Sequence, residues 1–277
     1  MEAYTDFASV YDMYMDNTPY EEWCERILRI RKEYDEKTVP EDDESLASEA
    51  NLILDLGCGT GTLTRMLADR GCDCIGIDNS FEMLELARSK EQSESDDTQA
   101  AAKSVLYLCQ DMREFELYST VGTVISICDC INYLIEEDDI LQTFKLVDNY
   151  LYPRGLFIFD FNTVHKYRDV IGDTTIAENR EDGSFIWENF YDEESRINEY
   201  DLTIYRKVPG DAEGNDIFVR SEETHIQRGY EIDTILRLLR EAGLEIVTFF
   251  DADTEEAADE DTERVCIVAR EVKKTFG

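Results

Sequence analysis

The sequence predicts an α/β fold with a mostly parallel sheet and an antiparallel β insertion in its second half. Short aliphatic segments alternate with helical patterns up to about residue 161, which is typical of βαβ units. Between about residues 173 and 228, runs of alternating polarity are separated by turn residues, which indicates three antiparallel strands. We therefore expect a core formed by 1–172 and 229–277, and an inserted lid or substrate-binding sheet at 173–228.

A glycine-rich turn follows the first predicted strand. Residues 52–56 are aliphatic except at Asp55, as in a parallel strand with both faces buried. Gly57, Gly59 and Gly61 come directly after it, and apolar residues then recur at helical spacing. Glycines here permit positive φ and let a ligand lie against the peptide groups. Strand, turn and helix together predict a nucleotide-type site at a helix N-terminus.

The residues around this turn bear on which nucleotide it holds. A dinucleotide-binding turn would have a third glycine at position 62, which is Thr62 here. The spacing of Asp55 and the three glycines instead resembles motif I of the class I S-adenosylmethionine-dependent methyltransferases. An acid before the turn would repel a pyrophosphate but can meet the ammonium group of S-adenosylmethionine. S-adenosylmethionine is therefore the expected cofactor, and a nicotinamide-dependent reductase is the less favoured alternative.

Two further acids stand at predicted strand ends. Asp78 ends the second strand, where a carboxylate is placed to accept hydrogen bonds from both ribose hydroxyls, although it is otherwise a common turn former. Asp111 ends the third strand and is followed by Met112. The resemblance implies that Asp111 receives the adenine amino group and that Met112 contacts the ring.

The resemblance covers nearly the whole chain. Residues 7–12, 128–134, 160–163 and 223–230 are similar to a branch of small bacterial methyltransferases related to the sugar-amine and glycine N-methyltransferases. It implies a Rossmann-like, seven-stranded, mostly parallel sheet with helices on both faces and an antiparallel last strand. It also implies these cofactor contacts: Tyr11, Asp55, Gly57, Cys58, Gly59, Gly61, Asp78, Asn79, Asp111, Met112 and Cys128.

Such an enzyme transfers a methyl group by in-line displacement to a nitrogen or oxygen atom, so it mainly aligns the acceptor and excludes water. Asp129 is expected either to orient or deprotonate the acceptor, or to cap the following helix. His225 is expected either to face the acceptor or to be a bonded strand histidine. Tyr11 either closes over the cofactor or packs on the core. Three aromatic residues either wall an acceptor pocket or form the lid's core: Tyr133, Trp187 and Tyr191.

The amino-acid composition limits the classes of methyl acceptor that are expected. The chain has 27 Lys and Arg residues against 64 Asp and Glu residues, a net charge of −37, which opposes binding to nucleic acid or anionic membranes. No Asn-Pro-Pro-Tyr or Asp-Pro-Pro-Tyr segment of base or amide methylases follows the fourth strand. We expect a small-molecule acceptor ahead of a protein. The rival function is a non-catalytic, S-adenosylmethionine-binding regulatory module whose acidic loops contact a partner.

The cysteines indicate a reducing compartment. Eight cysteines are present, and neither Cys72-x-Cys74 nor Cys128-x-Cys130 has the spacing of a zinc or thioredoxin-type site, so no metal is expected. Reduced core thiols, together with a first segment (1–6) that does not resemble a signal peptide, predict a cytoplasmic protein.

Overall fold

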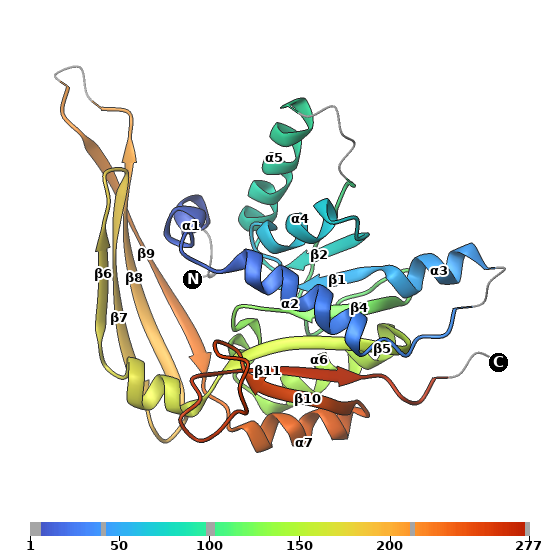
Figure 1. Ribbon diagram of the computed structural model, residues 1–277. Coiled ribbons are helices and arrows are strands. Elements are labelled where there is room, and N and C mark those ends of the chain that lie inside the picture. The colour runs from blue at the N-terminus through green and yellow to red at the C-terminus, as the bar shows by residue number, and fades with distance from the viewer. Residues whose placement is uncertain (1–6, 40–42, 98–102, 211–213, 275–277) are drawn as a thin grey trace.

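The computed structural model describes residues 7–39, 43–97, 103–210 and 214–274. A seven-stranded sheet forms the core, and a separate four-stranded antiparallel sheet stands beside it, with α1 between this second sheet and α5 (Figure 1). The helices are α1 (Ala8–Tyr14), α2 (Tyr20–Glu33), α3 (Glu44–Asn51), α4 (Thr62–Asp69), α5 (Phe81–Asp97), α6 (Glu137–Tyr150) and α7 (Ile232–Ala242). Two shorter helices are η1 (Cys130–Tyr133) and the π-helix η2 (Lys166–Ile171).

The core sheet has the strand order β10-β11-β5-β4-β1-β2-β3. Only β11 runs antiparallel to its two neighbours, which confirms the expected mostly parallel sheet. The order reverses beside β1, and the carboxyl ends of strands at such a switch point form the usual ligand crevice of an open α/β sheet. The strands are β1 (Ile53–Leu56), β2 (Cys74–Asp78), β3 (Leu106–Cys109), β4 (Val121–Ser126), β5 (Leu151–Asn162), β10 (Glu245–Asp251) and β11 (Arg264–Arg270).

Each face of the sheet is buried by its own set of helices. Phe144 of α6 and Leu239 of α7 belong to the same buried cluster as Leu54 on one face. Ile27 of α2 and Leu67 of α4 pack with Ile53 on the other. Neighbouring residues of β1 therefore enter different cores, which explains why that strand shows no alternation of polarity.

The second sheet has four strands, one more than the alternating pattern predicted. They are β6 (Thr175–Asn179), β7 (Gly183–Asp192), β8 (Ile197–Val208) and β9 (Ile217–Arg228), paired in sequence order. The pattern did not reveal β6 because it is an edge strand whose residues are mostly exposed. Phe185, Leu202 and Ile204 form a small core on the face toward α1, against Val10.

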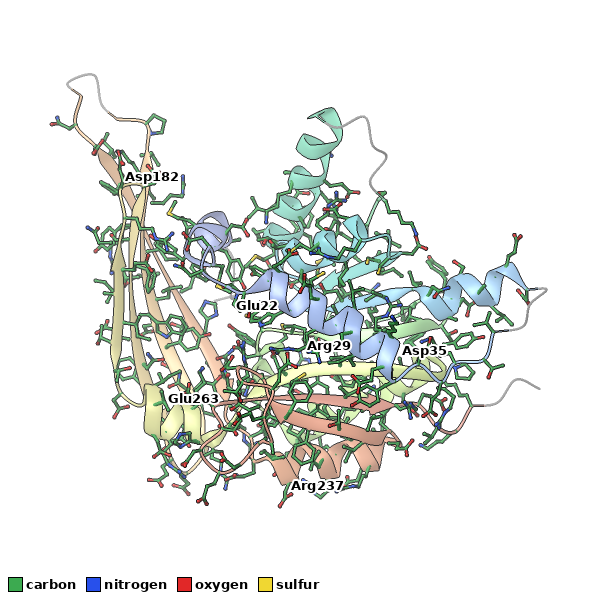
Figure 2. The ribbon with its side chains drawn as sticks, in the orientation of Figure 1. Glu22, Arg29, Asp35, Asp182, Arg237 and Glu263 are labelled. Atoms are coloured by element: carbon green, nitrogen blue, oxygen red, sulfur yellow. The ribbon has the colours of Figure 1, made fainter. Side chains whose placement is uncertain are left out.

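The polar segment before β1 contains α3, where the Asp43 carboxylate accepts hydrogen bonds from the backbone N–H groups of Ser45 and Leu46. The acidic segment 91–97 is the last part of α5. A second acidic segment forms the loop between β10 and β11. Its Glu255 accepts a hydrogen bond from Arg29, which projects from α2 (Figure 2).

Candidate functional site

The main cavity opens at the carboxyl ends of β1, β2, β3 and β4, where the strand order predicts a ligand site. Its volume is about 460 Å³, within the roughly 300–1,000 Å³ of small-molecule sites. Most of the predicted cofactor residues line it: Tyr11, Asp55, Gly57, Cys58, Gly59, Asp78, Asn79, Asp111, Met112 and Cys128. Of the predicted acceptor residues, Tyr133 lines it as well.

The glycine turn can be formed only with small residues. Gly57, with φ of +86°, approaches Cys130 so closely that a Cβ atom would lie 2.6 Å from its Sγ. Gly61, with φ of +73°, is the N-cap of α4, and a Cβ atom there would lie 2.4 Å from the Tyr107 hydroxyl. Gly59 lines the cavity, and no atom lies within 4 Å of the position that its Cβ would take. The turn is thus a backbone cradle that a side chain would fill.

Asp78 joins the glycine turn to the next helix. Its Oδ2 accepts the backbone N–H of Gly59 at 2.8 Å, and its Oδ1 accepts that of Ser80 at 2.8 Å. Ser80 in turn caps α5 by accepting the N–H of Met83. Burial raises the pKa of Asp78, although these backbone donors oppose the shift. The carboxylate is held at the cavity wall with lone pairs left for further donors.

Asp55 is a buried acid under the turn. Its Oδ2 accepts a 2.6 Å hydrogen bond from the Thr64 hydroxyl of α4. Burial raises the pKa of Asp55 to about 7, with Thr64 opposing the shift and the charge of Asp78 adding to it. A cationic ligand group in the cavity would favour the ionised form of this carboxyl.

Asp111 lines the cavity, but both of its oxygens are occupied. Arg113 donates to Oδ1 and Oδ2 at distances between 2.6 and 3.1 Å, and this pairing lowers the pKa of Asp111. Arg113 also reaches Asp139. The guanidinium therefore competes with an adenine amino group for the Asp111 oxygens. Met112 lines the cavity beside Gly57.

Helix α1 is tied to the glycine turn. The Thr60 hydroxyl donates to Asp12 at 2.7 Å, and Lys90 of α5 pairs with the same carboxylate at 2.7 Å. Lys90 also donates to the backbone carbonyl of Thr60. These contacts hold α1 over the cavity, so that Tyr11 lines it, while Val10 on the same helix packs on the second sheet.

A chain of polar side chains leads from the cavity into the second sheet. The Tyr133 hydroxyl lies 2.9 Å from the Tyr200 hydroxyl and 3.0 Å from Nδ1 of His225. Nε2 of His225 lies 3.4 Å from Oε2 of Glu223. Both His225 and Glu223 are 2% exposed. Among the described residues, His225 is not part of the cavity lining, and Tyr133, which is part of it, links His225 to the cavity.

Asp129 lies in a second buried network and does not line the cavity. Its Oδ2 accepts a 2.6 Å hydrogen bond from Gln227, which also binds the Tyr167 hydroxyl. Burial raises the pKa of Asp129 to about 6, and the charge of Asp160 adds to the shift. Asp129 is the residue before η1, but its side chain does not cap that helix.

The turn at Cys128 and Asp129 is strained and is held by Asp160. Both residues have positive φ, 71° and 51°, which costs about 1–3 kcal/mol for each non-glycine residue. The Asp160 carboxylate accepts both backbone N–H groups, at 3.2 Å from Cys128 and 2.7 Å from Asp129. A buried charge at the end of β5 thus shapes the cavity wall at Cys128.

Two predicted acceptor residues lie away from the cavity. Trp187 packs on Tyr200 with ring centroids 4.6 Å apart and donates to Asn189. Tyr191 sits on the same face of β7, and burial raises the pKa of its hydroxyl. Trp187 packs against the small core of the second sheet, as a residue of a lid core does. Two aromatic residues of α2 that are not among the predicted site residues also line the cavity, Tyr20 and Trp23.

The fold and the site together define a class. A glycine cradle, a carboxylate under it and acids at the ends of β2 and β3 fit a nucleoside carrying an amino acid group, that is, S-adenosylmethionine. Among the described residues, no group of three potential metal ligands was found. The protein is an α/β nucleotide-binding protein of the methyltransferase class.

Similarity to known proteins supports the assignment to the methyltransferase class. A family profile described as a methyltransferase domain matches residues 53–155. The chain is 34% identical over 275 residues to the Bacillus subtilis (strain 168) protein named “Putative methyltransferase YqeM”, with 98% of each chain covered. A crystal structure of an S-adenosylmethionine-dependent methyltransferase from Clostridium acetobutylicum ATCC 824 matches with a TM-score of 0.80 and 25% identity, covering 98% of this chain and 100% of that one.

A third match is an amino pentose methyltransferase from Micromonospora echinaspora, solved with S-adenosylmethionine bound. Its TM-score is 0.66 at 17% identity, with 98% of this chain and 99% of that one covered. The present chain belongs to the S-adenosylmethionine-dependent methyltransferases, and S-adenosylmethionine is its cofactor. In the described part of the chain, no helix is long and apolar enough to cross a membrane.

Proposed function

We propose that this protein methylates a nitrogen or oxygen atom of a small molecule, and that the preferred acceptor is an amine. The observation that carries the proposal is the charge of the cavity. Its acidic lining residues are Asp55, Asp78, Glu82 and Asp111, whereas Arg113 is the one cationic side chain among the described lining residues. Arg113 is already paired with Asp111. An acidic cavity favours a cation and disfavours a carboxylate or phosphate acceptor.

Aromatic rings support the same acceptor. Tyr11, Tyr20, Trp23 and Tyr133 line the cavity. Aromatic faces attract an ammonium group, and their edges exclude water. The structurally similar methyltransferase from Micromonospora echinaspora is described as acting on an amino pentose, which is in line with an amine acceptor.

The residues of the chain supply binding and alignment. The cradle at Gly57–Gly61 and Asp78 would hold the nucleoside part of the cofactor, with Asp55 near its ammonium group. When bound, S-adenosylmethionine supplies an electrophilic methyl carbon on a sulfonium with a good leaving group. Helix α1, fixed by Asp12, Thr60 and Lys90, covers the cavity and keeps water from the reacting atoms.

A transfer screen tests the proposal. The purified protein is incubated with S-adenosylmethionine carrying a labelled methyl group and with separate panels of small amines, hydroxy acids, nucleotides and peptides. Label is expected in products of the amine panel, and Asp78→Ala is the negative control. Transfer only to peptides would overturn the small-molecule acceptor, and transfer only to hydroxy acids or nucleotides would overturn the preference for an amine. Binding of the cofactor with no transfer to any panel would favour a non-catalytic regulatory module.

A further inference from the structure

Glu223, His225 and Tyr133 form a continuous polar path between the second sheet and the cavity. Glu223 and His225 lie on β9, two residues apart and therefore on one face of the strand, and Tyr133 ends η1. Of these three, Tyr133 alone lines the cavity. The path thus joins residues about ninety positions apart in the sequence and ends at the cavity.

The hydrogen-bonding capacity of each group determines which group donates its proton to which along the path. A buried carboxylate needs donors, and Glu223 receives the Phe7 N–H at 2.8 Å and faces Nε2 of His225. With a proton on Nε2, Nδ1 is a bare acceptor and takes the Tyr133 O–H. The Tyr133 oxygen then accepts the Tyr200 O–H at 2.9 Å, and the Tyr133 side chain lines the cavity.

Tyr200 fixes the imidazole. Its ring stacks on that of His225, with centroids 5.0 Å apart and planes 9° apart. Burial raises the pKa of Tyr200, so that its hydroxyl remains a donor. Other titratable groups facing this region are Asp129 and Tyr167, both bonded to Gln227 on β9.

We propose that Tyr133 accepts the proton that the acceptor must lose, and that His225, positioned by Glu223, receives it through the Tyr133 hydroxyl. This inference rests on the proposed function. An ammonium acceptor passes one proton to the Tyr133 oxygen while the Tyr133 hydroxyl proton moves to Nδ1 of His225. The freed nitrogen lone pair forms the C–N bond as the methyl–sulfur bond breaks and its electron pair stays on sulfur. The imidazolium, paired with Glu223, releases its proton to solvent after the product leaves.

Nitrogen NMR tests the path without any acceptor, because the chain has two histidines, His165 and His225. Protein labelled with ¹⁵N-histidine is compared with His165→Gln, which assigns the signals. His225 is expected in the Nε2–H form, and Tyr133→Phe should move the Nδ1 signal of His225 most. Tyr118→Phe, at an exposed tyrosine, should move neither signal. An Nδ1–H form of His225, or an Nδ1 signal unchanged in Tyr133→Phe, would overturn the path.

Kinetics with an amine found in the transfer screen test the proton transfer. Tyr133→Phe is expected to lower kcat about 100-fold or more, the scale of general base catalysis, with unchanged affinity for S-adenosylhomocysteine. His225→Gln should lower kcat as Tyr133→Phe does, whereas His165→Gln should leave kcat near the wild-type value. Tyr133→Phe with kcat within threefold of wild type would overturn the proposal. Absence of transfer to any acceptor, with the NMR result as expected, would instead count against the proposed function.

Discussion

Asp78 is the residue at which a substitution should separate cofactor binding from folding. Its two oxygens hold the N–H groups of Gly59 and Ser80 at 2.8 Å each, and both oxygens keep lone pairs toward the cavity. Replacement by asparagine removes the charge and turns one acceptor into an NH₂ group that faces a backbone donor. Charged hydrogen bonds are worth about 1.5–3 kcal/mol each, so the loss should be about 1–3 kcal/mol.

Titration calorimetry with S-adenosylhomocysteine measures this loss. Asp78→Asn should bind about 5-fold to 150-fold more weakly than wild type, and Asp78→Ala should bind at least as weakly. Because burial raises the pKa of Asp78, the fold disfavours its ionised form, and thermal unfolding of Asp78→Asn checks that the variant remains folded under the conditions of the titration. Asp73→Asn is the matched control, since Asp73 is exposed at the opposite end of β2. An affinity of Asp78→Asn within twofold of wild type would refute the assignment of Asp78 to the ribose.

Three other predictions follow from the residues around the cradle. The pKa of Asp55 is raised from 3.8 to about 7, so affinity for S-adenosylhomocysteine should fall as pH drops below about 7. For the same reason the free energy of unfolding should decrease as pH rises from about 4 to about 7. Calorimetry should show the first trend and thermal unfolding the second, and both should be flatter in Asp55→Asn. Gly57→Ala should destabilise the fold more than Gly71→Ala, because Gly71 has a similar φ of +90° but no described atom within 4 Å of its Cβ position. Cys130→Ala should restore part of the stability lost in Gly57→Ala. Equal effects of the two glycine substitutions in urea unfolding would contradict the steric explanation. Asn132→Ala should lower the free energy of unfolding by about 2–4 kcal/mol. The buried Asn132 amide donates to the backbone carbonyls of Asn162 and Arg228 and accepts the backbone N–H of Asn162. A loss below about 0.5 kcal/mol in urea unfolding would contradict this prediction.

The cofactor half of the site could be predicted from the sequence because it depends on residues that are close together along the chain. A strand followed at once by Gly57, Gly59 and Gly61 forms a cradle wherever the strand lies. Asp78 and Asp111 could be placed because carboxyl ends of parallel strands meet at one edge of a sheet. The sequence could not show that Arg113 occupies Asp111, since that pairing depends on side-chain conformation.

The acceptor half depends on contacts distant in sequence. Trp187 and His225 both lie on the inner face of the second sheet, as their strand positions allow, but α1 packs between that face and the cavity near Trp187. Asp129 follows a strand like Asp78, yet the strained turn directs its carboxylate toward Gln227 on β9. Periodicity identifies the face of a strand and says nothing of which element covers that face.

A crystal structure of the complex with S-adenosylhomocysteine is the most direct test of the site. The ribose is expected at Asp78, the adenine between Asp111 and Met112 with Arg113 turned aside, and the sulfur facing the side of the cavity lined by Tyr133. Adenosine bound elsewhere, or a sulfur atom directed away from Tyr133, would contradict both the assignment of the cofactor residues and the place of the acceptor.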